Sequence, residues 1–193
     1  FQTVDEVHWM PKERYQIMRS YLPTRGKLAT TMMGLTCTVQ ANLDYTDETH
    51  YSKTLRTATG ISPLVTAMFA NSPQCKEDTR RYQSYRSLVW TQVDPDRCGI
   101  QPFIYDTDCG YADYVDWALD VPMFFLSGPT GYINVSGTHS FRDLMEGRIP
   151  GQTATLDAWD LHLSTLFPEV RAKTHFEFRS ADVVPPKFIP ACP

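Results

Sequence analysis

The chain has 193 residues, and its charge and hydrophobic content already exclude several classes of protein. Hydrophobic residues make up 42% and charged residues 21%, which are ordinary values for a globular protein and argue against disorder. A formal net charge of −4 argues against a nucleic-acid binder, because such proteins carry a basic face. The apolar runs are far too short for a membrane span. We therefore expect one domain over 1–193 that binds neither nucleic acid nor membrane.

The five cysteines are widely spaced, and the sequence begins at Phe1 rather than Met. No C-x-x-C pair occurs and the number is odd, which argues against a zinc site and against a disulfide framework. Separate, reduced thiols are typical of a cytosolic protein, so we expect a cytoplasmic location. The polar start after Phe1 indicates that the sequence begins within a longer polypeptide or was processed.

Hydrophobic periodicity predicts helices mixed with short strands. A first helix covers 11–22, a strand with one polar and one apolar face covers 36–43, and a helix over 47–70 is interrupted near Gly60 and Pro63. The later expected elements are an exposed loop over 74–86, a helix or turn over 86–90, a turn-rich loop over 94–99, a helix over 111–119, strands over 123–126 and 132–135, a helix between Ser140 and Gly147, a helix over 155–167, a strand over 174–179 and an irregular tail over 183–193. Because no regular β-α-β rhythm appears, this order favours the α+β class.

The polar face of the strand over 36–43 carries no charge. It presents Thr36, Thr38, Gln40 and Asn42, side chains that donate and accept hydrogen bonds. One interpretation is the solvent-facing side of an antiparallel sheet. The other is a strand that lines a cleft and binds a polar ligand.

Glu177 and Arg179 share one face of the strand over 174–179. A carboxylate is a magnesium ligand, and the planar guanidinium group binds phosphate through two hydrogen bonds. The alternative is a surface ion pair, which contributes little. Asp182 follows and is placed to cap or bridge.

Two further segments have both structural and functional interpretations. Arg86 lies among aromatic residues, where an arginine stacks on a ring or holds a substrate carboxylate. The run 94–97 (DPDR) is typical of a solvated turn and, alternatively, of a metal loop. The histidines lack the spacing of a zinc site, and no P-loop or dinucleotide fingerprint occurs. The four tryptophans are typical of a core or a pocket wall.

Several blocks, taken in order, resemble the plant and proteobacterial type of glutamate–cysteine ligase over nearly the whole chain. The blocks are MRSYLPTRG (18–26), TMMGLTCTVQANLDY (31–45), AMFANSP (67–73), YRSLVWTQVDPDRCGIQPFIYD (85–106), YVDWALDVPMFF (114–125), LDAWDLHLSTLFPEVR (156–171) and FEFRSAD (176–182). The resemblance implies a glutamine-synthetase-like fold, in which a curved antiparallel sheet forms a funnel surrounded by helices, incomplete in this chain. It also implies an ATP- and magnesium-dependent ligase that joins the γ-carboxylate of glutamate to the amine of cysteine through a γ-glutamyl phosphate, the first step of glutathione biosynthesis.

The resemblance also implies roles for single residues. Glu177 and Gln40 would be metal ligands, Arg179 would contact the transferred phosphate, and Gln40, Asn42 and Arg179 would lie at the ATP. The glutamate substrate would be held by Thr36 and by Arg86, which binds its α-carboxylate. The cysteine pocket would be walled by Trp117 and Trp90.

The sequence departs from the family pattern at several positions. Leu35 stands where an arginine is usual, and Trp117 stands where a tyrosine is usual. The redox cysteines of the plant enzymes fall at Val135, Gly151 and Pro190, so a thiol switch of that kind is not expected.

Family members are about twice this length, and a strand with clustered glutamates would precede Phe1. We therefore expect one partial catalytic domain, inactive by itself, completed by the remaining segments of the same polypeptide or by a complementary chain. The alternatives are a non-catalytic fragment or partner subunit of a split ligase, and a sister carboxylate–amine ligase with another acceptor. The location would be plastidic if the source is a plant.

Overall fold

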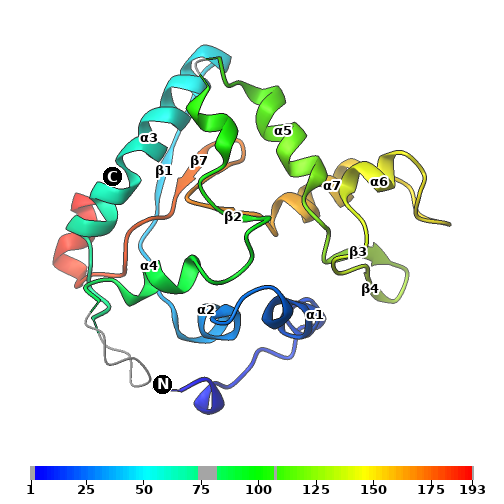
Figure 1. Ribbon diagram of the computed structural model, residues 1–193, viewed down its shortest axis with the longest axis horizontal. Helices are drawn as coiled ribbons and strands as arrows, with labels where there is room; N and C mark the ends of the chain where they lie inside the picture. Colours follow the sequence, from blue (N-terminus) through cyan, green and yellow to red (C-terminus); the bar gives the residue numbers. More distant parts are fainter. Residues whose placement is uncertain (1–2, 74–81, 107, 193) are drawn as a thin grey trace.

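The computed structural model describes residues 3–73, 82–106 and 108–192 (Figure 1). Helices alternate with short strands, which confirms the predicted α+β class. The α-helices are α1 (Glu13–Tyr21), α2 (Ala29–Leu35), α3 (Glu48–Met68), α4 (Tyr85–Trp90), α5 (Tyr111–Asp120), α6 (Phe141–Met145) and α7 (Leu156–Leu163). The short 3-10 helices are η1 (Val4–Glu6), η2 (Leu22–Thr24), η3 (Pro102–Tyr105) and η4 (Pro186–Ala191). No helix in the described part of the chain is both long and apolar enough to cross a membrane.

The strands form three small sheets. The largest has the order β1-β7-β6 and is antiparallel, β2 pairs with β5 in parallel, and β3 and β4 form a hairpin. The bounds are β1 (Ala41–Leu43), β2 (Cys98–Gly99), β3 (Phe125–Gly128), β4 (Gly131–Asn134), β5 (Phe167–Pro168), β6 (Val170–Ala172) and β7 (Phe176–Phe178). These short strands do not by themselves make a funnel, so that part of the prediction stays a prediction.

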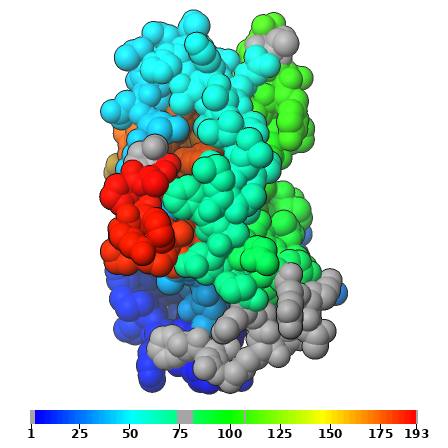
Figure 2. Space-filling view, turned by 90° about the vertical axis from the view of Figure 1, so that its left-hand side faces the viewer, coloured from blue at the N-terminus to red at the C-terminus, as the bar shows by residue number. Residues whose placement is uncertain are grey.

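The largest sheet has one apolar and one polar face. Phe176 and Phe178 of β7 point to the apolar side and pack with Leu55 and Ala58 of α3, which runs beside β1 in Figure 1. Strand alternation places Glu177 on the opposite side. The C-terminal segment with η4 lies against α3 on the outside (Figure 2). Helix α3 therefore covers one face of the sheet and leaves the polar face for the site.

The predicted strand over 36–43 is largely wrong. Residues 29–35 form helix α2, Thr36 is the residue that ends it, and the ladder with β7 begins only at Ala41. Between them, Thr38 forms an isolated bridge to Asp182. The alternation of polar and apolar residues continues across a helix end and a strand start, so it does not mark one continuous strand.

Helix α3 is continuous where an interruption near Gly60 and Pro63 was expected. Pro63 lacks an N–H and so leaves the carbonyl of Thr59, four residues earlier, without its helical donor. The hydroxyl of Ser62 donates to that carbonyl at 2.8 Å. Because the carbonyl is satisfied and the helix is packed on the sheet, the proline is tolerated.

Several other predictions can be compared with the structure. The helix over 111–119 and the two strands around 128–131 are confirmed with small shifts at their ends, whereas the helix predicted over 155–167 ends at Leu163 and strand β5 follows. The tail contains η4 where irregular structure was expected. The loop predicted over 74–86 falls mostly on residues 74–81, which lie outside the described residues.

A buried ion pair lies in the core beside the ring of Phe124. Arg97 and Asp94 are joined at 2.6 Å with neither side chain exposed, and the Arg97 guanidinium lies 3.8 Å from the centre of the Phe124 ring. Arg97 also donates to the carbonyl of Pro122 at 2.7 Å. The turn predicted over 94–97 is confirmed, but the expectation that it is solvated is wrong, because Asp94 and Arg97 are buried. The Asp94 carboxylate is engaged by Arg97, which argues against the metal-loop alternative.

Candidate functional site

The candidate site is a cluster of charged side chains on the polar face of the largest sheet. The register pairs Arg171 of β6 with Glu177 of β7, and Glu177 with Asn42 of β1. Arg171 Nε and Nη2 lie 2.6 and 2.5 Å from Glu177 Oε2. Lys173 Nζ forms an ion pair with Glu177 Oε1, and Arg179 Nη1 lies 3.6 Å from Glu177 Oε2. Three cations thus converge on one carboxylate.

The electrostatics of this cluster are set by burial and by its neighbours. Burial raises the pKa of Glu177, but the hydrogen bond from Lys173 and the charge of Arg171 outweigh it, so the pKa lies below its ordinary value. Burial, together with the charge of Arg171, lowers the pKa of Arg179 to about 10. Both groups are therefore ionised at neutral pH, and the cluster keeps an excess of positive charge.

Helix α4 brings Arg86 and Trp90 to the same place. The Arg86 guanidinium is buried and donates from Nη2 to the main-chain carbonyl of Arg179 at 2.8 Å. The Trp90 ring centre lies 5.8 Å from the guanidinium carbon of Arg86 and 5.4 Å from that of Arg179. The Trp90 indole N–H is buried and has no hydrogen-bond partner among the described residues. The ring of Trp90 therefore contacts the guanidinium groups of both Arg86 and Arg179.

Asp182 fixes the start of α4 from a distant part of the chain. Its Oδ2 accepts from the hydroxyl of Ser72 at 2.6 Å and from the backbone N–H of Asn71 at 2.8 Å, and its Oδ1 accepts from Ser84 at 2.9 Å. Ser84 caps α4 by accepting from the N–H of Ser87, and Ser72 accepts from the N–H of Arg86. The predicted capping or bridging role of Asp182 is thus confirmed.

The structure brings together only some of the residues predicted for the site. Asn42 and Gln40 are exposed, and Asn42 is paired in register with Glu177. The Thr36 hydroxyl donates to the carbonyl of Met32 at 2.8 Å, which closes helix α2. Trp117 packs against Phe103 and Tyr114, and its indole donates to the carbonyl of Asp96, so its described contacts are all outside the cluster.

Arg171 and Lys173 belong to the cluster but were missed from the sequence. Their spacing of two residues places both on the face that carries Glu177 and Arg179 after the turn. The segment 170–179 (VRAKTHFEFR) therefore contained the signal: two alternating cations, a turn, then an acid and a cation. Only strand β7 was predicted there, so the pairing with β6 was not available.

The described residues do not by themselves make a magnesium site. No group of three or more His, Cys, Asp or Glu side chains with metal-binding geometry occurs in residues 3–73, 82–106 and 108–192. Both oxygens of Glu177, one of the two predicted ligands, are engaged by cationic side chains, and Gln40 is exposed. The pair Glu177 and Gln40 thus does not fit a metal ion as the side chains stand.

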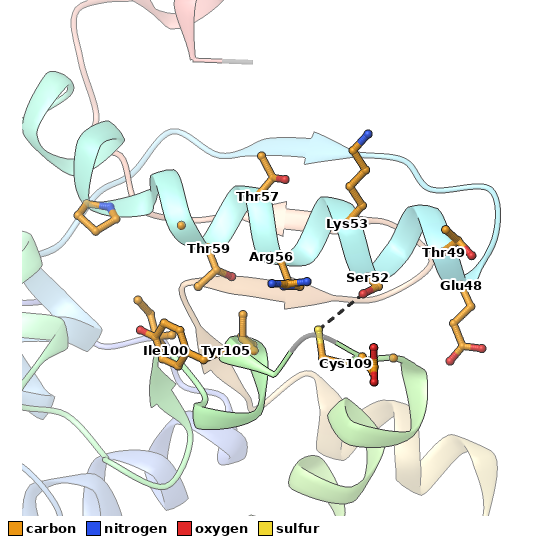
Figure 3. Close-up of a pocket in the computed structure, with 15 residues that line it drawn as sticks. Glu48, Thr49, Ser52, Lys53, Arg56, Thr57, Thr59, Ile100, Tyr105 and Cys109 are labelled. Atoms are coloured by element: carbon orange, nitrogen blue, oxygen red, sulfur yellow. Dashed lines mark hydrogen bonds between the residues drawn. The ribbon is translucent and has the colours of Figure 1, made fainter.

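A large cavity lies away from this cluster. It has a volume of about 920 Å³ between α3 and the segment 100–110. In Figure 3, Ser52 and Thr59 point toward that segment, whereas Lys53 and Thr57 point away; Ser52 Oγ lies 3.8 Å from Cys109 Sγ. None of the residues predicted for catalysis or binding lines this cavity.

Comparisons with known proteins give the chain a family. The chain is 46% identical over 187 residues to the chloroplastic glutamate–cysteine ligase of Nicotiana tabacum, and these residues cover 95% of this chain and 36% of the relative. It is 45% identical to the chloroplastic ligase B of Oryza sativa subsp. japonica (98% of this chain, 39% of the relative) and 42% identical to the chloroplastic ligase of Arabidopsis thaliana (98% and 37%). The chain thus spans less than two-fifths of the length of these relatives. The sequence pattern of Glutamate-cysteine ligase family 2 matches residues 3–191, and the chain belongs to this family.

Proposed function

We propose that this chain forms part of the catalytic domain of an ATP-dependent ligase that joins the γ-carboxylate of glutamate to the amine of cysteine. Membership of the family supports this reaction. One observation in the structure carries the proposal: Arg86, Trp90, Glu177 and Arg179, which come from two distant segments of the sequence, meet in one cluster. Two buried arginines, and an indole N–H that finds no partner in the described part of the chain, suit a carboxylate and a phosphate.

The reaction needs two steps that balance in atoms and charge. First, an oxygen of the glutamate γ-carboxylate attacks the γ-phosphorus of ATP, the bond to the β-phosphate oxygen breaks, and ADP leaves with that electron pair. The nitrogen of cysteine then attacks the carbonyl carbon of the acyl phosphate, inorganic phosphate leaves, and the amine loses a proton. Catalysis of phosphoryl transfer depends on positioning and charge stabilisation, which cationic side chains supply.

We assign roles to single residues from the family resemblance. Arg179, which remains charged at neutral pH, donates to the oxygens of the transferred phosphoryl group. Arg86 binds the α-carboxylate of glutamate after exchanging its contact with the Arg179 carbonyl. Trp90 lines the substrate pocket, and Gln40, directly before β1, and Asn42, in β1, face the nucleotide. The roles of Thr36 and Trp117 require further elements of the domain, since neither side chain contacts the cluster.

Magnesium accompanies ATP in this proposal as the partner of its phosphates, and no step is assigned to it. The negative charges of ATP and glutamate would compensate the excess positive charge of the cluster. In this proposal the product, γ-glutamylcysteine, is the first intermediate of glutathione biosynthesis. The relatives are named chloroplastic, which agrees with a plastid location rather than the cytoplasmic one expected from the cysteines.

The test uses the full natural polypeptide that contains these residues. With ATP, glutamate and cysteine we expect ADP, phosphate and γ-glutamylcysteine in equal amounts. Product with another amine but not with cysteine would point to a sister ligase, and the absence of any ATP-dependent product would contradict the proposal.

The role of Arg179 is tested by Arg179→Lys. It keeps the charge but loses the planar group, so we expect kcat to fall about 100-fold or more. The matched control is Arg148→Lys, which alters an exposed arginine paired with Asp143 and Glu146; we expect wild-type kcat. Equal effects of both substitutions would remove Arg179 from the reaction.

A further inference from the structure

The cavity between α3 and the segment 100–110 lies apart from the candidate site. Its volume of about 920 Å³ is within the range typical of small-molecule sites. Phe176 and Phe178 pack with α3 on one face of the sheet, whereas Glu177 and its partners occupy the other face. A molecule bound in the cavity would therefore leave the charged cluster free to bind the substrates.

Three polar side chains of α3 face this cavity. In Figure 3, Ser52, Arg56 and Thr59 follow one another on the side of the helix that faces the segment 100–110. The Thr59 side chain is buried, and its hydroxyl has no hydrogen-bond partner in the part of the chain that the structure describes. Because buried polar groups nearly always have a partner, this hydroxyl points to a ligand that accepts hydrogen bonds. A guanidinium group has five N–H donors, so Arg56 can bind a carboxylate with two of them and keep other contacts.

The helix leaves room for a ligand beside these polar groups. Gly60 lines the cavity, and a methyl group added to it would meet no atom within 4 Å. Across from the helix, the lining includes the apolar side chains of Ile100 and Ile104 and the ring of Tyr105. The cavity thus has hydrogen-bond donors on its helical side and an apolar surface on the other.

The two acidic residues that line the cavity lie toward the start of α3. Glu48 is the first residue of the helix, and its Oε1 accepts from the backbone N–H of Tyr111 at 2.9 Å. Asp108 precedes Cys109, whose thiol lies 3.8 Å from the Ser52 hydroxyl. Residues 55–63 of the helix contain no acid. The part of the cavity beyond Ser52 therefore offers one positive charge and hydroxyl groups, which suits an anion.

We propose that this cavity binds a small organic carboxylate. The charged group of the ligand accepts hydrogen bonds from Arg56 and from the hydroxyls of Ser52 and Thr59. Its carbon chain lies against Ile100 and Ile104, and the burial of that chain adds affinity that an inorganic anion lacks. This ligand is neither a substrate nor a product of the proposed reaction, so the inference goes beyond the proposed function and does not rest on it.

The experiment measures the binding of three probes to the full natural polypeptide by ligand-observed NMR titration. The probes are hexanoate, hexylamine, which has the same carbon chain with the opposite charge, and inorganic phosphate, which has negative charge without a chain. We expect hexanoate to bind about 10-fold or more tightly than either of the others. Equal affinities for hexanoate and hexylamine would overturn the inference. So would the absence of hexanoate binding, the result expected if water alone or another segment of the polypeptide fills the cavity.

Substitutions at exposed positions of α3 test whether the bound probe lies in this cavity. Arg56→Met removes the guanidinium group, and we expect hexanoate to bind about 10- to 100-fold more weakly. Gly60→Met fills the open space and should also weaken binding; because methionine is a better helix former than glycine, we expect no loss of stability in urea. The matched control is Lys53→Met, which removes a cation that points away from the segment 100–110 in Figure 3 and should leave the affinity unchanged. Unchanged binding in both Arg56→Met and Gly60→Met, or an equal loss in Lys53→Met, would overturn the inference.

Discussion

His162 makes the stability of this chain depend on pH in a way that can be calculated from its surroundings. The ring is buried, its Nε2–H donates to the carbonyl of Ala118 at 2.7 Å, and Nδ1 has no hydrogen-bond partner among the described residues. The rings of Phe141 and Trp159 lie against it, with centres 5.6 and 5.7 Å away. A proton on Nδ1 would therefore create a buried charge with nothing to accept its hydrogen bond.

Burial lowers the pKa of His162 to about 4, and the nearby charge of Arg97 acts in the same direction. An exposed histidine in the unfolded chain has a pKa of about 6.5, so the unfolded state binds one more proton than the folded state between these two values. Stability therefore falls as the pH drops from about 6.5 to about 4 and loses nothing more from this group below that. A difference of about 2.5 pKa units corresponds to about 3 kcal/mol.

The measurement is the free energy of unfolding in urea at pH 7 and at pH 4.5. In His162→Gln the amide can donate to the Ala118 carbonyl but does not titrate, so the loss of stability between the two pH values should be about 2 to 3 kcal/mol smaller than in the wild type. The control His50→Gln removes an exposed histidine and should keep the wild-type loss. The same loss in wild type and His162→Gln would refute the reasoning.

Four further substitutions, one of them made only in combination, test the core and helix α3 by urea unfolding. Arg97→Met should lower the free energy of unfolding by about 3 to 5 kcal/mol, because it leaves the Asp94 carboxylate buried without its main partner. Adding Asp94→Asn should recover part of that loss. An unchanged free energy of unfolding in Arg97→Met would contradict this prediction. Ser62→Ala should cost about 1 kcal/mol by leaving the Thr59 carbonyl without a donor, and a neutral result would show that the proline is tolerated for another reason. Gly60→Ala should stabilise by about 0.5 to 1 kcal/mol, since the added methyl meets no atom within 4 Å, and destabilisation would argue against a regular helix there.

Local periodicity could predict the elements whose apolar residues follow the period of one helix or strand from end to end. Helix α5 has its apolar residues in phase, and the hairpin β3–β4 lies around a turn rich in glycine, so both were predicted. The strand predicted over 36–43 was largely wrong, because the alternation that suggested it does not depend on a partner strand. Only three of its residues pair with β7, and its first residue, Thr36, ends helix α2 instead.

Local patterns also predicted only the part of the candidate site that lies on one strand. Glu177 and Arg179 stand two residues apart, so their shared face followed from strand geometry alone. The partners of Glu177 come from β6, and a cross-strand register depends on contacts that no local pattern contains. Trp90 and Trp117 were assigned to one pocket wall from the family resemblance, and the structure places Trp90 against the arginines and Trp117 against Phe103.

The contacts of Asp182 also have a consequence for redesigning the chain. Asp182 accepts from the hydroxyls of both Ser72 and Ser84, the backbone N–H of Tyr85 donates to the carbonyl of Ser72, and the segment 74–81 connects these two anchored ends. The hydroxyl groups of Ser72 and Ser84 thus hold both ends at one carboxylate. An insertion between Ser84 and Arg86 would therefore separate the arginine from its anchor.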